Sequence, residues 1–309
     1  NLDNNATSTG HSYTFAHNVT ATTINLGHSS SNANATLIVP FTASNQIGIT
    51  GDIVGSTNAS TSDNKAGGRF WVKGNSTVTG SIGSISGILA DIRINEGTTL
   101  TIKGASNSIY ANNITMMNVP LNSTNATLAF NGTGTTTVNG IIAGLGNGEG
   151  LIDINTATVS FKNTVGTNTN YISAINIASG ANMTTSSNIY ANDTIIVIGK
   201  LNIDALSGIT IAANDDNGKG YGLQVGTTSS LNASLETAGT IILTSNDKTS
   251  ATSGSTAQFN NATIKLNGTH SSHSGISTAY IDIGTNNQTL VMQGDTTIDL
   301  DLTNTVITD

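Results

Sequence analysis

Short segments in which every second residue is aliphatic recur along the whole chain. They include Ile92–Ile94, Leu100–Ile102 and Ile152–Ile154, with Arg, Thr or Asp between the aliphatic residues. A period of two places the aliphatic side chains on one face of a β-strand and the polar side chains on the other. No segment shows the spacing of three and four residues that marks an amphipathic helix. The pattern therefore predicts an all-β protein with almost no helix.

Clusters of Gly, Asn and Ser, such as residues 144–148, separate these segments and supply the turns. Strand and turn signals alternate roughly every 8–12 residues, which suits either a β-sandwich or a β-solenoid. Aromatic residues make up only 4% of the chain, and a sandwich core usually contains several. Proline occurs only twice, as expected where most strands are central. The sequence therefore predicts a β-solenoid, a right-handed parallel β-helix of short strands and Gly/Asn-rich turns.

Two pairs of segments resemble each other within the chain. Residues 188–195 resemble 108–115, and residues 137–143 resemble 77–83. The similarity is degenerate and indicates recurrence of coils rather than a strict repeat. With roughly 20–25 residues per coil, about 12–15 coils stacked ~4.8 Å apart form a rod on the order of 60–70 Å long.

Composition does not shift along the chain, so we expect one solenoid domain, residues 36–309. An N-terminal irregular or capping segment, residues 1–35, contains few aliphatic residues and precedes it.

The net charge and the cysteine content limit the partners and the cellular location that we expect for the chain. The formal net charge is −8 and the isoelectric point is about 4.8, which argues against nucleic acid or anionic membrane as a partner. The absence of cysteine in 309 residues suits an exported protein. The sequence has no initiating Met, no signal peptide and no apolar run of about 18 residues. We therefore expect a processed piece that is extracellular or on the cell surface and does not itself insert into a membrane.

Three phrases, STVTGSIG at 76–83, LAFNGT at 128–133 and ANDT at 191–194, carry a resemblance to a known family. With the high Asn, Thr and Gly content around them, they resemble the passenger domains of bacterial autotransporters, in particular the rickettsial surface cell antigen and outer membrane protein B group. The resemblance implies a long β-solenoid displayed outside the cell, where it serves adhesion, invasion or a surface layer. The family's signal and membrane barrel are not in this sequence, and the resemblance brings no catalytic residue with it.

Asp299 and Asp301 form the best carboxylate pair in the sequence, because residues two apart share one face of a strand. No His, Arg or Lys lies within ten residues of them, and an outward acidic pair commonly protects a sheet edge. Asp153, Asp204 and Asp282 also lie between apolar residues and could stack on outward faces. A stacked column of carboxylates repels itself unless a cation such as calcium lies between them.

Asp215 and Asp216 lie in the most polar stretch of the chain, residues 214–220, which resembles half of a calcium loop. With Gly218 at the sixth loop position, however, the first and twelfth positions hold Ala and Gln instead of Asp and Glu. A protruding turn is the favoured interpretation. Asp215, Asp216, Asp299 and Asp301 remain the weak candidates for a metal site, with calcium as the only cofactor considered.

Other catalytic patterns are weak. His270 and His273 lack a third metal ligand, and a polar loop explains them better. No Gly-X-Ser-X-Gly elbow is present. We therefore expect no enzymatic activity and no cofactor-binding residues.

Residues 67–73, with the sequence GGRFWVK, differ from the rest of the chain. They hold the only Trp, two aromatic residues and two cations. This composition indicates a recognition patch or subunit contact made of Arg69, Phe70, Trp71 and Lys73. A Phe–Trp pair that fills the core at a coil corner is the alternative.

Two functions of different class remain. The first is a surface-displayed passenger that binds a receptor on a host or neighbouring cell. The second is a self-assembling subunit of a surface layer or extracellular filament, joined through the ends of the solenoid. A β-helix enzyme that acts on polysaccharides is the third and least favoured class.

Overall fold

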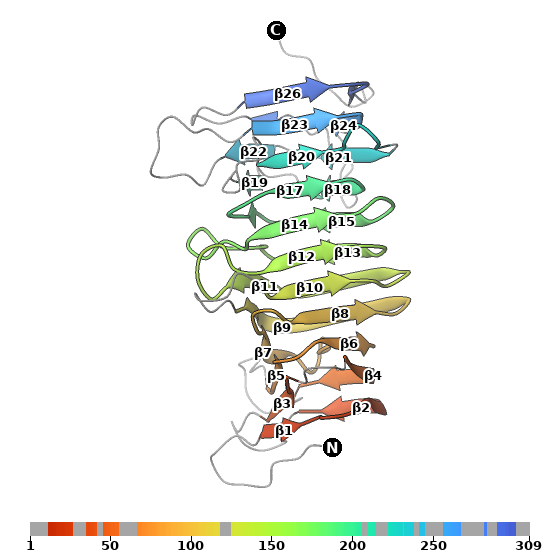
Figure 1. Ribbon diagram of the computed structural model, residues 1–309, viewed down its shortest axis with the longest axis vertical. Helices are drawn as coiled ribbons and strands as arrows, with labels where there is room; N and C mark the ends of the chain where they lie inside the picture. Colours follow the sequence, from red (N-terminus) through yellow and green to blue (C-terminus); the bar gives the residue numbers. More distant parts are fainter. Residues whose placement is uncertain are drawn as a thin grey trace.

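The computed structural model is an elongated rod of stacked β-coils (Figure 1). It describes residues 12–26, 35–41, 46–55, 67–117, 125–205, 209–213, 222–230, 232–237, 241–244, 256–266, 281–282 and 289–300. Within these residues the chain forms 27 strands and no helix. The predicted all-β class is confirmed.

The strands form three sheets. The 11-stranded sheet contains, in spatial order, β2 (Val19–Asn25), β4 (Ile47–Val54), β6 (Ser76–Thr79), β8 (Thr99–Lys103), β10 (Thr127–Phe130), β12 (Leu151–Ile154), β14 (Ala174–Ile177), β17 (Ile195–Val197), β20 (Leu223–Val225), β23 (Thr256–Asn260) and β26 (Thr289–Gln293). The 12-stranded sheet contains β1 (Ser12–Thr14), β3 (Thr36–Val39), β5 (Arg69–Val72), β7 (Leu89–Ile94), β9 (Ser106–Met116), β11 (Thr135–Gly144), β13 (Thr158–Phe161), β15 (Asn182–Thr185), β18 (Lys200–Ile203), β21 (Ala233–Thr237), β24 (Ala262–Leu266) and β27 (Thr297–Leu300). The 4-stranded sheet contains β16 (Ile189–Tyr190), β19 (Ile209–Ala212), β22 (Ile241–Thr244) and β25 (Ile281–Asp282).

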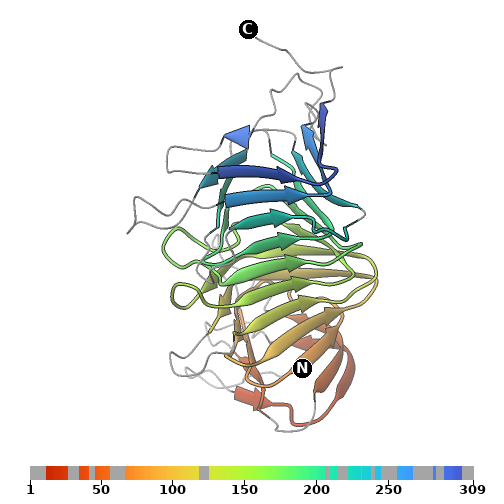
Figure 2. The same cartoon turned by 45° about the horizontal axis from the view of Figure 1, so that its top comes forward.

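Every named strand pair is parallel, and each strand pairs with the strands one coil before and one coil after it. This arrangement is a parallel β-helix, which confirms the predicted solenoid. Figure 2 shows the same coils stacked from the N-terminal end to the C-terminal end. The long strands β9 and β11 bend from one side of the rod to the next, with a register shift between Asn139 and Ile141. Single bridges from Ile142 to Val165 and from Val165 to Ile189 continue this third side into the 4-stranded sheet.

Inward-facing residues stack in columns that run along the rod. One column crosses nine coils, and each member is at most 3% exposed: Leu37, Phe70, Ile92, Ile114, Ile142, Val165, Ile189, Ile211 and Leu243. Phe130 and Phe161 meet edge to face in the core, with ring centroids 5.9 Å apart. Because each fully buried side chain contributes roughly 1.5–3 kcal/mol, the columns hold successive coils together along the whole rod.

The coils vary in length more than the sequence pattern predicts. In the ladder of the 12-stranded sheet, 18 residues separate Asn182 from Lys200, and 34 separate Lys200 from Ser234. The extra residues of the longer coils lie largely outside the described residues. The 11-stranded sheet has one strand per coil and β27 of the 12-stranded sheet begins a further coil, so the described residues form 11 full coils and the start of a twelfth, at the lower end of the expected 12–15. At ~4.8 Å per coil this gives a stack of about 50 Å.

Stacking also begins earlier than residue 36. β1 pairs with β3, and β2 pairs with β4, so residues 12–25 already belong to the coils. The internal similarities do not mark equivalent positions either. Val78 lies in the 11-stranded sheet and Val138 in the 12-stranded sheet. Both valines nevertheless face the core. Similar strand and turn sequences therefore occur on different sides of the rod.

Candidate functional site

The outward side of β5, β7 and β9 carries the densest group of cationic and aromatic side chains in the described part of the chain. Arg69, Trp71 and Lys73 stand on one coil, and Asp91, Arg93 and Asn95 stand on the next. Thr115 follows on β9. The register pairs Arg69 with Asp91 and Trp71 with Arg93, so these side chains form a grid with rows about 4.8 Å apart. We call this grid the β5–β9 patch.

The alternating pattern of β5 explains how this patch is positioned. Phe70 and Val72 face the core and are 0% exposed, which turns Arg69, Trp71 and Lys73 outward. Gly68 directly precedes the strand with a φ of 83°, and a Cβ at this position would lie 2.7 Å from the Cβ of Leu26. Only glycine brings the chain this close to the preceding coil and into left-handed backbone.

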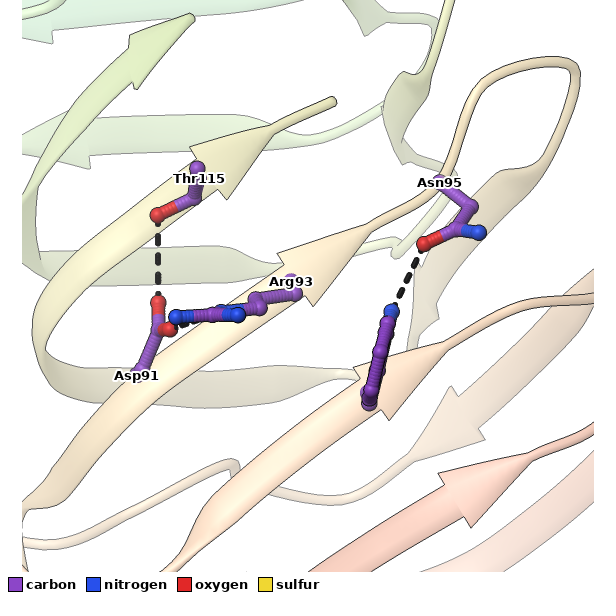
Figure 3. Close-up of polar contacts among 5 residues, drawn as sticks. Asp91, Arg93, Asn95 and Thr115 are labelled. Carbon is purple, nitrogen blue, oxygen red and sulfur yellow. Dashed lines mark hydrogen bonds and ion pairs between the residues drawn. The ribbon is translucent and has the colours of Figure 1, made fainter. Parts of the chain in front are cut away.

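Asp91 organises the centre of the patch. It is 7% exposed, accepts a hydrogen bond from Arg93 Nε, and accepts a second from Thr115 Oγ1 at 3.1 Å. Figure 3 shows both contacts across β7 and β9. A buried carboxylate needs partners of this kind. It also holds the Arg93 guanidinium in one place through Nε, with 38% of the Arg93 side chain exposed.

Trp71 is fixed from two sides. Its indole Nε1 donates a hydrogen bond of 2.6 Å to Asn95 Oδ1, drawn in Figure 3. The Nζ of Lys73 lies 3.8 Å from the centroid of the ring, a cation–π contact. The Trp71 side chain is half-buried and held by both contacts.

The electrostatic character of the patch is opposite to that of the chain. The patch contains three cations, Arg69, Lys73 and Arg93, and the single carboxylate of Asp91, whereas the whole chain has a net charge of −8. Arg69 and Arg93 are the only two Arg residues of the sequence. Among the described residues, no carboxylate lies within ion-pair distance of Arg69 or Lys73.

A second charged group lies nearer the C-terminal end of the rod, on β18, β21 and β24. The carboxylate of Glu236 forms ion pairs with Lys200 and with Lys265, and Lys265 Nζ lies 3.3 Å from Glu236 Oε1. The Glu236 side chain is 12% exposed, and both lysines are 38% exposed. Asp299 of β27 is in backbone register with Lys265. This ladder links neighbouring coils and has no aromatic member.

The structure places some residues of the predicted recognition patch on the surface and one in the core. Arg69, Trp71 and Lys73 lie together on the surface, but the prediction is wrong for Phe70, which belongs to the core column. Phe70 lies two residues before Val72 on the same strand, so its side chain faces the core as that of Val72 does. Sequence reasoning missed Asp91, Arg93, Asn95 and Thr115, because they join the patch only through the register of the coils.

The metal candidates receive no support from the described residues. Asp215, Asp216 and Asp301 lie outside them, as do His270 and His273, and of Asp299 only the backbone is described. The stacked column of Asp153, Asp204 and Asp282 is wrong, because Asp153 lies on β12, Asp204 follows β18 and Asp282 lies on β25, in three different sheets. Within the described ranges, no group of three or more His, Asp or Glu side chains could hold a metal ion.

Comparisons of the chain with protein-family models, with curated proteins and with solved structures found no match. In the part of the chain that the structure describes, there is no helix of the length and hydropathy needed to cross a membrane.

Proposed function

We propose that this chain is an extracellular β-solenoid passenger that acts in adhesion, and that the β5–β9 patch is its contact surface. The observation that carries the proposal is the grouping of the only Trp and both Arg residues on one outward side of an otherwise weakly charged rod. Trp and Arg are the residue types that most often dominate binding energy at interfaces. The resemblance to autotransporter passengers points to the same role.

The core supports a display function. Its columns are built almost entirely of apolar side chains that face inward, so the outward positions are available for recognition. The rod also holds the patch on short central strands. A site on such strands keeps its geometry better than one on loops.

The proposal is tested by adhesion of protein-coated beads to cultured cells. Wild-type beads should adhere, and beads with Arg69→Gln, Trp71→Ala and Lys73→Gln combined should lose most of this adhesion. Lys162→Gln is the matched control, because Lys162 is exposed and lies outside the patch. Equal adhesion of the wild type and the triple variant would show that the patch is not the contact surface.

A second candidate function, end-to-end assembly, rests on a different observation. Val159, Met183, Leu201, Leu235 and Ile264 form a core column that is 0–1% exposed, and Ile298 continues it at 48% exposed. Met292 on the adjacent β26 is 44% exposed. A coil that exposes its core positions and its strand edges is a template for another coil.

For assembly we predict association of the isolated chain through its ends, with a change of oligomeric state when residues 1–20 are deleted. Light scattering should show a mass that rises with protein concentration, and Ile298→Asp should lower it. A strictly monomeric protein at high concentration, with and without calcium, would exclude this second function.

A further inference from the structure

We infer that the β5–β9 patch binds the terminal, carboxylate-bearing sugar of an otherwise neutral oligosaccharide. The inference rests on the proposed function and names the ligand class of the same surface. It follows from three properties of the patch: guanidinium donors that have no partner among the described residues, a fixed indole, and amide and hydroxyl groups in the same patch.

The guanidinium groups recognise the carboxylate. Arg69 is exposed and has no acidic partner among the described residues, so its planar group of donors is available for a bidentate bond to a carboxylate. Arg93 uses Nε for Asp91, and the structure gives its two terminal nitrogens no partner within the described residues. Because the two arginines stand on adjacent coils in neighbouring columns of the grid, one small anion can lie between them.

The neutral part of the ligand meets the rest of the patch. Trp71 offers a half-buried indole, and aromatic rings bind apolar surface at low entropic cost because they have few rotatable bonds. Asn113 is exposed beside Asp91 in the ladder. Asn95, which bonds to the indole, and Thr115, which lies beside Arg93 on the next coil, are partly exposed. Amide and hydroxyl groups of this kind donate to and accept from sugar hydroxyls.

The charge balance favours a single acidic sugar over a polyanion. The patch holds three cations and one carboxylate, so its excess is two positive charges. A long polyanion would extend beyond these residues onto a chain whose net charge is −8. At physiological salt, charges more than about 8 Å apart are largely screened, so only the groups within the patch act strongly on the ligand.

The single Trp makes the test direct, since all tryptophan fluorescence of the chain reports on the patch. Sialyllactose is the probe, with lactose as the neutral counterpart and a heparin oligosaccharide as the polyanion. Sialyllactose should change the fluorescence saturably, whereas lactose at the same concentration should not. Raising the salt from roughly 0.05 to 0.5 M should weaken the binding.

Arg69→Gln should weaken sialyllactose binding by about ten-fold or more. Arg93→Lys keeps a cation beside Asp91 but lacks the second nitrogen of the fork, so it should also weaken binding. Lys162→Gln should leave the affinity within about two-fold of the wild type. Arg69 is exposed, so loss of folding does not explain its effect, and an unchanged thermal transition verifies this.

The outcomes of the binding and adhesion experiments distinguish the ligand class from the proposed function. No response to sialyllactose, an equal response to lactose, tighter binding of the heparin oligosaccharide or no effect of Arg69→Gln would overturn the inference. Cell adhesion that depends on the patch without sialyllactose binding would leave the proposed function intact and reject only this ligand class. Sialyllactose binding without cell adhesion would reject the proposed function and keep the ligand.

Discussion

Ser76 interrupts an aliphatic column, and its replacement should stabilise the protein. It stands between Ile47 and Leu100 in the 11-stranded sheet and is 0% exposed. Its Oγ atom has no hydrogen-bond partner, the only buried side-chain oxygen or nitrogen in the described residues with this property. A buried hydroxyl without a partner loses its bonds to water and gains nothing in return.

The magnitude follows from two opposing terms. Removing an unsatisfied buried hydroxyl relieves about 1–3 kcal/mol. Ser76→Ala leaves a void of roughly one atom, which costs a few tenths of a kcal/mol at about 24 cal/mol per Å³. We therefore expect Ser76→Ala to raise the free energy of unfolding by about 1 kcal/mol. Ser76→Val would add methyl groups to a packed column, and overpacking of about 1–3 kcal/mol could cancel the gain.

Urea unfolding followed by circular dichroism measures this change as a shift of the midpoint to higher urea. Ser81→Ala is the matched control, because Ser81 Oγ accepts a hydrogen bond of 3.1 Å from the backbone N–H of Ser108. Its loss should lower the stability by about 1 kcal/mol. The two serine-to-alanine changes should thus have opposite signs. A lower midpoint for Ser76→Ala would refute the reasoning from the unsatisfied hydroxyl.

Three further predictions test the core, the charged ladder and the pH dependence. Ile92→Ala should reduce stability by about 2–5 kcal/mol in urea unfolding, because Ile92 is buried in a core column that crosses nine coils; a loss below about 1 kcal/mol would contradict its place there. Glu236→Gln should cost about 1–2 kcal/mol, since it leaves two partly exposed lysines without their carboxylate, and high salt should shrink the difference. Burial, and secondly the charge of Tyr190, raises the pKa of Tyr171 above 10.0. The folded state therefore holds this proton more tightly than the unfolded state, and stability should fall as the pH rises past 10.0. Tyr171→Phe should remove part of that fall in thermal unfolding across this range, and identical curves would refute the assignment.

The fold could be predicted because alternation alone decides which side chains face the core. Ile92 and Ile94 are buried and Arg93 is outward, as their period of two requires. The same rule places Phe70 and Val72 inside and separates Phe70 from the patch. Composition suggested an association of Phe70 with Trp71, but adjacent residues of a strand point to opposite faces.

The length of each individual coil could not be predicted, because nothing local specifies how many residues a turn contains. The 34 residues between Lys200 and Ser234 include segments rich in Gly, Asn and Asp, which fit a turn of almost any length. The cost of closing a loop grows slowly with its length, so the core columns tolerate such insertions. Outward neighbours then depend on a register that sequence patterns do not specify.

A recurring offset relates the members of the patch to one another. Trp71 bonds to Asn95 and Thr115 bonds to Asp91, and the partners in each pair are 24 residues apart. The amide groups of Asn155 and Asn131 bond over the same offset in a different part of the rod. Coils of 22–24 residues therefore bring together polar side chains that face outward on the same side of successive coils, although the chain has no strict repeat.

This offset holds only where the coils are regular. An offset of 24 residues pairs Trp71 with Asn95 and Asn131 with Asn155, whereas the intervening coil from Thr99 to Thr127 spans 28 residues. Beyond residue 200 the coils lengthen, and the Lys200–Glu236 ion pair spans 36 residues. Side chains of separate coils therefore meet at an offset set by the local coil length, which is 24 residues for the pairs in the β5–β9 patch and longer for the ion pairs of Glu236.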